Sequence, residues 1–249
     1  PVPDELLVYK FDYEFPNDAV DRRDIVIGML NPDWSQFSYQ LEFAFKEQES
    51  SHFNAAGTTT WSKAPGLRED VSRVVNDFNA ALQQGFERIL LNRGFTTKGP
   101  FGNLQDMTYP DKKACNLVLM PKCSFSIQTS NVEHLSDQVS GTAVLRWSLD
   151  LVVYEPMSGE KLWQKQIALV SEPFEFKYVY DVDGIYNTSY TRIGLTRKGI
   201  TWDNRAQRLA KEFEGFYPTV MSTCWEYVNR EEMGVLKGHS DDIRAQKVF

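Results

Sequence analysis

Two glutamates stand on either side of a short turn-like sequence, EPMSGE (155–160), and a carboxylate pair is a common acid–base arrangement in enzymes. Between Glu155 and Glu160, Pro156 presets the first dihedral angle of a turn and Gly159 accepts a positive φ angle. Strand-like residues continue on both sides, so we predict a β-hairpin with a bulge at Gly159. Its loop would hold both carboxylates in solvent, without the cleft or perturbing neighbour that catalysis requires.

The cysteines and histidines are the other residues that could react or bind a metal. The sequence has no Cys-x-x-Cys pair and no two histidines at helical spacing, so we expect buried thiols and isolated imidazoles. It also has no GxSxG, HExxH, P-loop or GxGxxG sequence. We therefore expect a protein that is not an enzyme, with no catalytic residue, no metal and no cofactor. The residues concerned are Cys115, Cys123, Cys224, His52, His134 and His239.

Composition narrows the class of protein further. The chain has 249 residues, 42% of them hydrophobic, which suits one large globular domain. Its net charge of -7 argues against a nucleic-acid partner, which a basic patch would attract. No run of 18 apolar residues predicts a transmembrane helix. The start, PVPD, has no Met, and we interpret the chain as a processed form from which a targeting segment has been removed.

Aromatic and polar residues alternate with period two in three stretches, 7–15, 37–45 and 174–180, and this pattern predicts half-buried antiparallel strands. The continuous apolar run 24–30 predicts a central strand. In the strand predicted at 142–155, the odd positions would face the core. The hairpin register then follows from keeping large groups on one face: Val153 should oppose Trp163, Leu149 should oppose Ile167, and Trp147 should oppose Leu169. A slip of one residue would send Trp163 outward.

Spacings of three and four residues predict two long helices. The first covers residues 69–93 and ends at Gly94, where a left-handed residue is favoured. The second runs from 203 to about 230, and Pro218 should kink or split it. Residues 231–249 form a polar C-terminal tail, for which we leave open a short helix followed by a frayed end. Residues 130–141 form a loop and 36–66 an aromatic-rich insertion, while Pro121 should bend the strand at 115–127 or place it at an edge.

These elements predict a single α+β domain over residues 1–249. We expect a mixed, mainly antiparallel sheet with two long helices packed on one face, plus an extra aromatic-rich β-hairpin or insertion. This layout is similar to the amino-terminal domain of TolB.

Three segments carry a closer resemblance: ALQQGFERILLNRGF (81–95), EPMSGEKL (155–162) and the final helix with its VLKGHSDD sequence. They resemble the HpaA family of neuraminyllactose-binding haemagglutinins, also called flagellar sheath adhesins. The resemblance implies a non-enzymatic outer-membrane or cell-surface lipoprotein, facing outward or toward the periplasm, whose lipidated N-terminal Cys is not in this sequence. It also implies an adhesin that contacts a host glycan or an envelope or sheath protein.

The family name implies an alternative function, binding of sialylated glycans through a short basic motif. The corresponding slot here, QTSNVEHLSDQVSG (128–141), has no Lys or Arg, so no binding residue is carried over. Stacking on a sugar would instead use tryptophans in loop-like sequence, namely Trp34, Trp61 and Trp202.

The alternating stretches hold more aromatic residues than two helices can cover, since each helix is about 10 Å wide. We therefore predict that part of them forms an interaction surface, covered by the insertion, by a second copy of the chain, or by a partner or the membrane. The residues proposed for this surface are Phe37, Tyr39, Phe43, Phe174, Phe176 and Tyr178.

Overall fold

The computed structural model describes residues 8–16, 24–39, 43, 46–50, 60–64, 68–186 and 192–247. The elements follow the chain in the order β1 (Val26–Leu30), β2 (Asp33–Tyr39), β3 (Lys46–Ser50), β4 (Thr60–Ala64), α2 (Glu69–Asn92), β5 (Thr96–Phe101), α3 (Tyr109–Ala114), β6 (Leu117–His134), β7 (Gln138–Tyr154), β8 (Lys161–Val170), β9 (Phe174–Tyr186), β10 (Arg192–Asp203), α4 (Arg205–Tyr227) and α5 (Arg230–Gln246).

The strands form one large mixed sheet in the order β10-β9-β7-β6-β1-β5, with β2 added to β6 and β8 added to β7. The pairs β1–β5, β1–β6 and β2–β6 are parallel, and the other pairs of this sheet are antiparallel. Strands β3 and β4 pair only with each other within the described part of the chain. The α+β prediction of a mixed, mainly antiparallel sheet is therefore confirmed.

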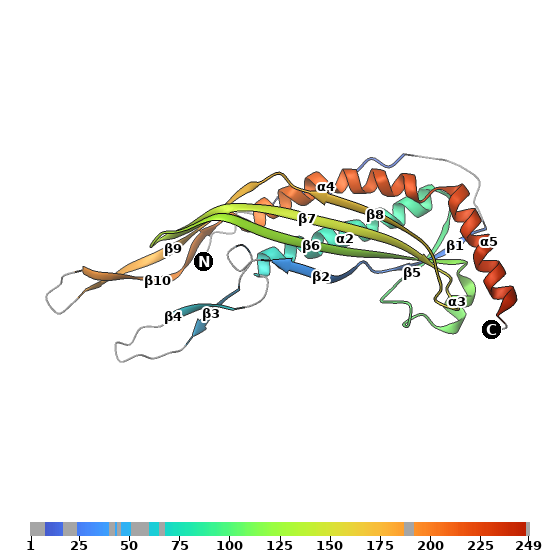
Figure 1. Cartoon of the computed structure of the whole chain (residues 1–249), viewed down its shortest axis with the longest axis horizontal. Helices are drawn as coiled ribbons and strands as arrows, with labels where there is room; N and C mark the ends of the chain where they lie inside the picture. The colour runs from blue at the N-terminus through green and yellow to red at the C-terminus, as the bar shows by residue number, and fades with distance from the viewer. Residues whose placement is uncertain are drawn as a thin grey trace.

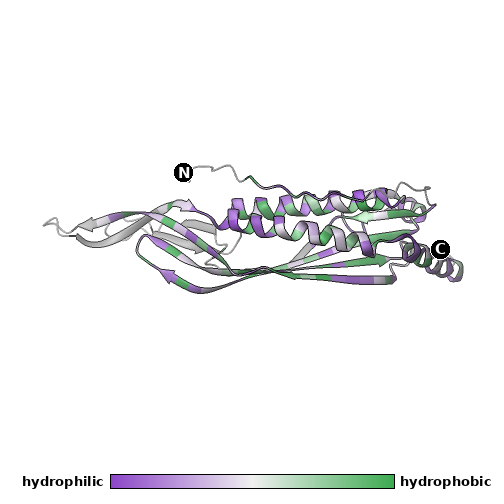
Figure 2. Ribbon diagram, turned by 90° about the horizontal axis from the view of Figure 1, so that it is seen from above, coloured by the Kyte–Doolittle hydropathy of each residue, from purple (hydrophilic) through white to green (hydrophobic). Residues whose placement is uncertain are grey.

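The two long helices α2 and α4 lie side by side on one face of the sheet, as predicted (Figure 2). Helix α2 buries one apolar stripe along its length and ends where the sequence indicated. Gly94 has a φ angle of 81°, and the N–H of Phe95 donates to the carbonyl of Leu90 at 3.0 Å, which closes the last turn.

The two helices approach closely at Gly85. A methyl group added there would lie 2.3 Å from Sδ of Met221 and 3.0 Å from Oη of Tyr217, both on α4. We expect Gly85→Ala to lower the free energy of unfolding by about 1–2 kcal/mol, because overpacking outweighs the better helix propensity of Ala. Gly215→Ala is the matched control, since a methyl group there would meet nothing within 4 Å and should stabilise by about 0.5–1 kcal/mol. Equal effects in urea unfolding would contradict a tight contact at Gly85.

The C-terminal region differs from the prediction in two places. Pro218 lies inside α4 without splitting it, and the helix continues to Tyr227. Most of the expected polar tail is α5, an ordered helix. The side chain of Asn229 caps its start by accepting from the N–H of Glu232, and Met233 and Leu236 are buried against the core. The sequence left a short helix open here, but its few apolar residues did not indicate a helix of 17 residues.

Strands β6 and β7 pair over most of their length, and this long antiparallel pair runs along the long axis of the molecule (Figure 1). Pro121 does not place β6 at an edge, because β6 is paired on both sides. It lies between Leu119, where the pairing with β1 ends, and Lys122, where the pairing with β2 begins, so neither β1 nor β2 needs its missing N–H. The loop predicted at 130–141 shrinks to residues 135–137, because both strands extend through it.

The β7–β8 hairpin has the predicted register. Val153 pairs with Trp163, Leu149 with Ile167 and Trp147 with Leu169. Trp163 packs against the core on the face of Val153 and Trp147, which confirms the argument from apolar residues. The prediction of a bulge at Gly159 is wrong. The bulge lies within β8 at Leu162, because Val153 pairs with Trp163 while Tyr154 pairs with Lys161.

The first alternating stretch is not a strand. Its described part, residues 8–16, is extended but belongs to neither sheet, and it lies along α2 and α4 (Figure 2). We call it the strap. The alternation is real, because Tyr9, Phe11, Tyr13 and Phe15 pack against the core while the residues between them are exposed. Period two indicates an extended chain with one buried face, and residues 8–16 have that form. The prediction that this segment is a strand of the sheet is wrong, because it packs on the helices instead.

Two ribbons project beyond the helices at one end of the molecule, one made of β9 and β10 and the other of β3 and β4 (Figure 1). The β3–β4 ribbon falls inside the segment 36–66 that the sequence marked as an insertion. The opposite end holds α5 and the turn between β7 and β8.

Candidate functional site

The face of the sheet turned away from the helices carries a shallow groove of about 490 Å³ that is lined more by apolar than by polar surface. It spans β2, β6, β7 and β8 in the middle of the sheet. The described residues that line it are Ser38, Ser124, Phe125, Ser126, Arg146, Trp147, Ser148, Ala168, Leu169 and Val170. Four of these described residues are serines and one is an arginine, so the polar groups described there are hydroxyls and a guanidinium.

The alternation of β7 explains this surface. Leu145, Trp147 and Leu149 are buried against the helices, so Arg146 and Ser148 must point to the opposite face. The register of β6 on β7 adds a second hydroxyl: Ser124 of β6 pairs with Ser148 of β7, and their Oγ atoms are 2.7 Å apart. Strand β2, parallel to β6, contributes Ser38 beside Ser126.

Arg146 is exposed, and no described residue accepts a hydrogen bond or ion pair from its guanidinium. A planar guanidinium binds a carboxylate through two parallel N–H donors. The serine hydroxyls can donate or accept, and Val170, 55% exposed, offers an apolar edge. The groove is therefore suited to a small ligand that combines one carboxylate with hydroxyl groups.

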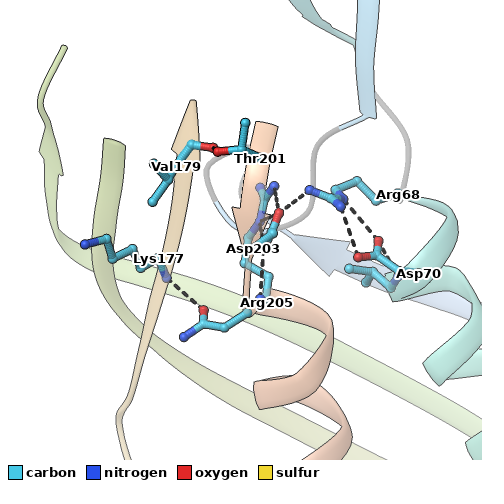
Figure 3. Close-up of polar contacts among 9 residues, drawn as sticks. Arg68, Asp70, Lys177, Val179, Thr201, Asp203 and Arg205 are labelled. Carbon is cyan, nitrogen blue, oxygen red and sulfur yellow. Dashed lines mark hydrogen bonds and ion pairs between the residues drawn. The ribbon is translucent and has the colours of Figure 1, made fainter. Parts of the chain in front are cut away.

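A second polar cluster lies where the β9–β10 ribbon joins the helices (Figure 3). Asp203, at the end of β10, accepts from the Nε of Arg205 at 3.0 Å and also pairs with Arg68, which directly precedes α2. Arg68 makes a bidentate contact with Asp70, both distances being 3.0 Å. One carboxylate thus links the base of the β9–β10 ribbon to the starts of both helices.

This cluster is buried rather than open to a substrate. Arg205 is fully buried and its guanidinium carbon lies 4.0 Å from the ring centre of Tyr178 on β9. Burial is the main cause that raises the pKa of the Tyr178 hydroxyl above its ordinary value. The adjacent Asn204 is bonded in both directions to the main chain of Lys177. We interpret the cluster as the support that fixes the ribbon on the helical layer.

The turn at 155–160 corrects the prediction for one of its two glutamates. Gly159 has the predicted positive φ angle of 71°, and Glu160 is half exposed beside Lys247. Glu155, however, is fully buried. It accepts from Nε of Arg244 on α5 at 2.8 Å, and Arg244 also donates to the carbonyl of Cys115 at 2.7 Å. The turn is an attachment point for α5, which supplies the charged neighbour that the sequence did not indicate.

The charge state of Glu155 follows from these contacts. Burial alone would raise the pKa of its carboxyl group, but the N–H of Ser158 and the guanidinium of Arg244 outweigh it and hold the pKa below the ordinary value of 4.5. The carboxylate therefore stabilises the fold above about pH 4.5, and this contribution is lost as the pH falls through the lowered pKa.

We expect Glu155→Gln to cost about 2–3 kcal/mol of unfolding free energy at pH 7, because it leaves Arg244 without its anion. Unfolding free energies measured from pH 7 to pH 3 should show the gap between wild type and variant narrowing below pH 4.5. Glu160→Gln, which removes only the exposed partner of Lys247, is the matched control and should cost less than about 1 kcal/mol. A gap that stays constant with pH would show that Glu155 contributes through packing alone.

Four of the six aromatic residues proposed as an interaction surface, Phe43, Phe174, Phe176 and Tyr178, are buried within the chain and form no exposed surface. Phe43 is covered completely and packs edge-on against Phe174 and Phe176, with ring centres 5.8 and 5.5 Å apart. Tyr178 is covered by Arg205. Phe43 lies in the predicted insertion 36–66, so part of this cover comes from the insertion, the first of the three alternatives that the sequence left open. The side chains of Phe37 and Tyr39 lie outside the described residues.

The three tryptophans chosen as sugar platforms lie in strands, not loops: Trp34 in β2, Trp61 in β4 and Trp202 in β10. Trp202 is 40% exposed, so it remains available for stacking. The side chains of Trp34 and Trp61 are not described. Trp202 is not among the described residues that line the Arg146 groove.

The remaining expectations concern metals, thiols and membrane spans. All three cysteines are buried and unpaired, as predicted. Among the described residues, no group of three or more His, Cys, Asp or Glu could hold a metal ion. None of the described helices is long and apolar enough to cross a membrane.

Together these features define the chain as an elongated two-layer α+β domain, with helices on one face of the sheet and the Arg146 groove on the other. No protein-family model and no curated protein matches it. Among solved structures, a candidate neuraminyllactose-binding hemagglutinin homolog from Helicobacter pylori has a TM-score of 0.59 at 14% identity, covering 94% of this chain and 98% of that chain. This likeness shows a shared fold.

A structure of the lipoprotein GNA1162 from Neisseria meningitidis gives a TM-score of 0.26 at 12% identity, over 59% of this chain and 83% of that chain. That score is too low to relate the two folds.

Proposed function

We propose that this chain is the folded domain of a non-enzymatic surface lipoprotein that acts by binding a protein or a host surface. The observation that supports this proposal most is the structural likeness to the hemagglutinin homolog, which extends over nearly the whole of both chains. The open sheet face supports it, because helices cover the other face and leave this one to meet a partner. The corresponding location is the outer membrane or a flagellar sheath, with an N-terminal lipid anchor.

Cell fractionation combined with surface labelling tests this location. An antibody against the domain should detect the protein in the outer-membrane fraction of the source cells. Labelling of intact cells would place the domain on the outside, and labelling only after permeabilisation would place it in the periplasm. Recovery of all the protein in the soluble fraction would contradict a lipoprotein.

The Arg146 groove favours a second candidate function, recognition of a sialylated glycan. A sialic acid carries a carboxylate for Arg146, hydroxyls for Ser124, Ser126 and Ser148, and an acetyl methyl group that could contact Val170. The basic residue missing from the 128–141 slot of the sequence is thus available from the neighbouring strand. The Helicobacter pylori protein that shares the fold is, by its name, a homolog of a neuraminyllactose-binding hemagglutinin.

We expect Arg146→Gln to weaken binding of the domain to immobilised sialyllactose by at least roughly tenfold, since a charge-assisted pair contributes about 1.5–3 kcal/mol. Arg146→Lys should recover only part of the affinity, because an ammonium group cannot bind in the bidentate geometry. Lys161→Gln, an exposed cation at the far end of β8, should have no effect. Equal binding of wild type to lactose without sialic acid would contradict recognition of the carboxylate.

A further inference from the structure

The strap is attached to the helices mainly through its side chains. Phe11 reaches between α2 and α4, with its ring centre 5.2 Å from that of Phe78 and 5.9 Å from that of Tyr217. Phe15 lies beneath the guanidinium of Arg88, and the hydroxyl of Tyr9 donates to Asp77. These contacts alternate along the strap and fix its register on the two helices.

The main chain of the strap contributes little to this attachment. Its N–H at Lys10 donates to Glu214 at 2.6 Å, and its carbonyl at Pro16 accepts from Asn92 at 3.4 Å. Residues 8–16 belong to no ladder of strands, so removing the strap breaks no row of sheet hydrogen bonds. Segments held by few main-chain bonds are the ones that open locally at low free-energy cost.

The first residues of the strap are also the least closely packed. A cavity of about 410 Å³ lies between Val8, Tyr9 and the first turns of α4, lined there by Gln207, Arg208 and Lys211, with Ala210 and Glu214. Val8 itself is 90% exposed. Detachment can therefore begin at this end and proceed toward Phe11.

An open strap would leave an aromatic groove that needs an occupant. Phe78 and Tyr217 are buried in the closed chain, and loss of the Phe11 ring would expose them to water. The structure shows which segment fits: a chain with aromatic residues at alternate positions, a tyrosine hydroxyl for Asp77 and a main-chain donor for Glu214. Residues 8–16 of a second copy meet every one of these requirements.

We propose that the α2–α4 groove is an interface between copies of this chain, in which the strap of each copy occupies the groove of the other. Exchange of an identical segment replaces every contact with the same contact, so the dimer forms at low cost and is favoured by concentration. This interface is independent of the Arg146 groove on the opposite face and of any ligand bound there.

Cross-linking between two single-cysteine variants tests the exchange. Lys10→Cys places a thiol on the exposed side of the strap, and Glu214→Cys places one on α4 beside it. The native thiols of Cys115, Cys123 and Cys224 are buried and should not react. The two variants are mixed at high concentration, incubated below the unfolding temperature and treated with a short bismaleimide. The product is then separated by mass under denaturing conditions.

The proposal predicts a cross-linked product of twice the chain mass that contains one copy of each variant and increases with protein concentration. Adding Phe11→Ala to the Lys10→Cys chain should reduce this product several-fold, because the strap no longer seats in a groove. The double variant Lys10→Cys/Glu214→Cys measures closed straps through linkage within one chain. Complete linkage within that double variant, together with no mixed product or one unchanged by Phe11→Ala, would overturn the exchange.

Discussion

Replacing Asp203 by Asn should lower the free energy of unfolding by about 3–5 kcal/mol, one of the two largest effects that the structure predicts for a single substitution. Asp203 is the anion for two arginines, Arg68 and Arg205, and its side chain is only 2% exposed. Asn keeps the shape and one acceptor oxygen but removes the charge. The fully buried guanidinium of Arg205 would then lose the charge of its Asp203 partner, and weakening a buried ion pair is costly.

Asp70→Asn is the matched control, because it removes a carboxylate from the same cluster at a site where solvent can compensate. The side chain of Asp70 is 25% exposed and pairs only with Arg68 in a direct ion pair. We expect a loss of about 1 kcal/mol. Urea unfolding followed by both fluorescence and circular dichroism measures the two losses. Similar small losses in both variants would mean that Arg205 is stabilised chiefly by the Tyr178 ring.

Features that depend on neighbouring residues could be predicted from the sequence. The register of the β7–β8 hairpin was predictable because Val153 and Trp163 lie ten residues apart, and only one alignment keeps both in the core. The end of α2 was predictable because Gly94 is the residue type that a left-handed cap favours. In each case the apolar pattern and the local backbone preference point to the same structure.

Features that depend on residues far apart in the sequence could not be predicted from it. Glu155 looked solvated because its partner, Arg244, is 89 residues away on a helix that carries little apolar signal. The strap was predicted as a strand because an alternating pattern indicates that one face of an extended chain is buried, but it does not indicate whether a sheet or helices cover that face. The burial of Phe174 and Phe176 depends on Phe43, which the sequence places in a different predicted strand. Alternation shows that a side chain needs a cover, whereas the fold decides which element provides it.

The Arg146 groove illustrates the same division within one site. The outward direction of Arg146 and Ser148 follows from the alternation of β7. Their meeting with Ser124 and Ser38 requires the register of β7 on β6 and the parallel pairing of β2 with β6. Parallel pairing joins segments separated by long connections, and its register has no turn to fix it. The site was therefore not visible from any single motif.

Phe78→Ala should lower the free energy of unfolding by about 3–5 kcal/mol, because the ring lies where four elements of the fold meet. It stacks on Phe213 of α4 with ring centres 4.3 Å apart, and it contacts Trp147 of β7 edge-on at 5.8 Å. The strap reaches it through Phe11 at 5.2 Å. The side chain has no exposed area, so truncation leaves a cavity that all these neighbours would have to move to fill.

Leu91→Ala provides the control on the same helix, since Leu91 is 57% exposed and should cost less than about 1 kcal/mol. The double variant Phe78→Ala/Phe213→Ala separates stacking from cavity formation. Because the two rings share one contact, the second truncation should cost less than it does in the wild-type background, by about 0.5–1.5 kcal/mol. Strictly additive losses in urea unfolding would show that the two rings pack against separate parts of the core, and the α2–α4 contact would then not depend on this stack.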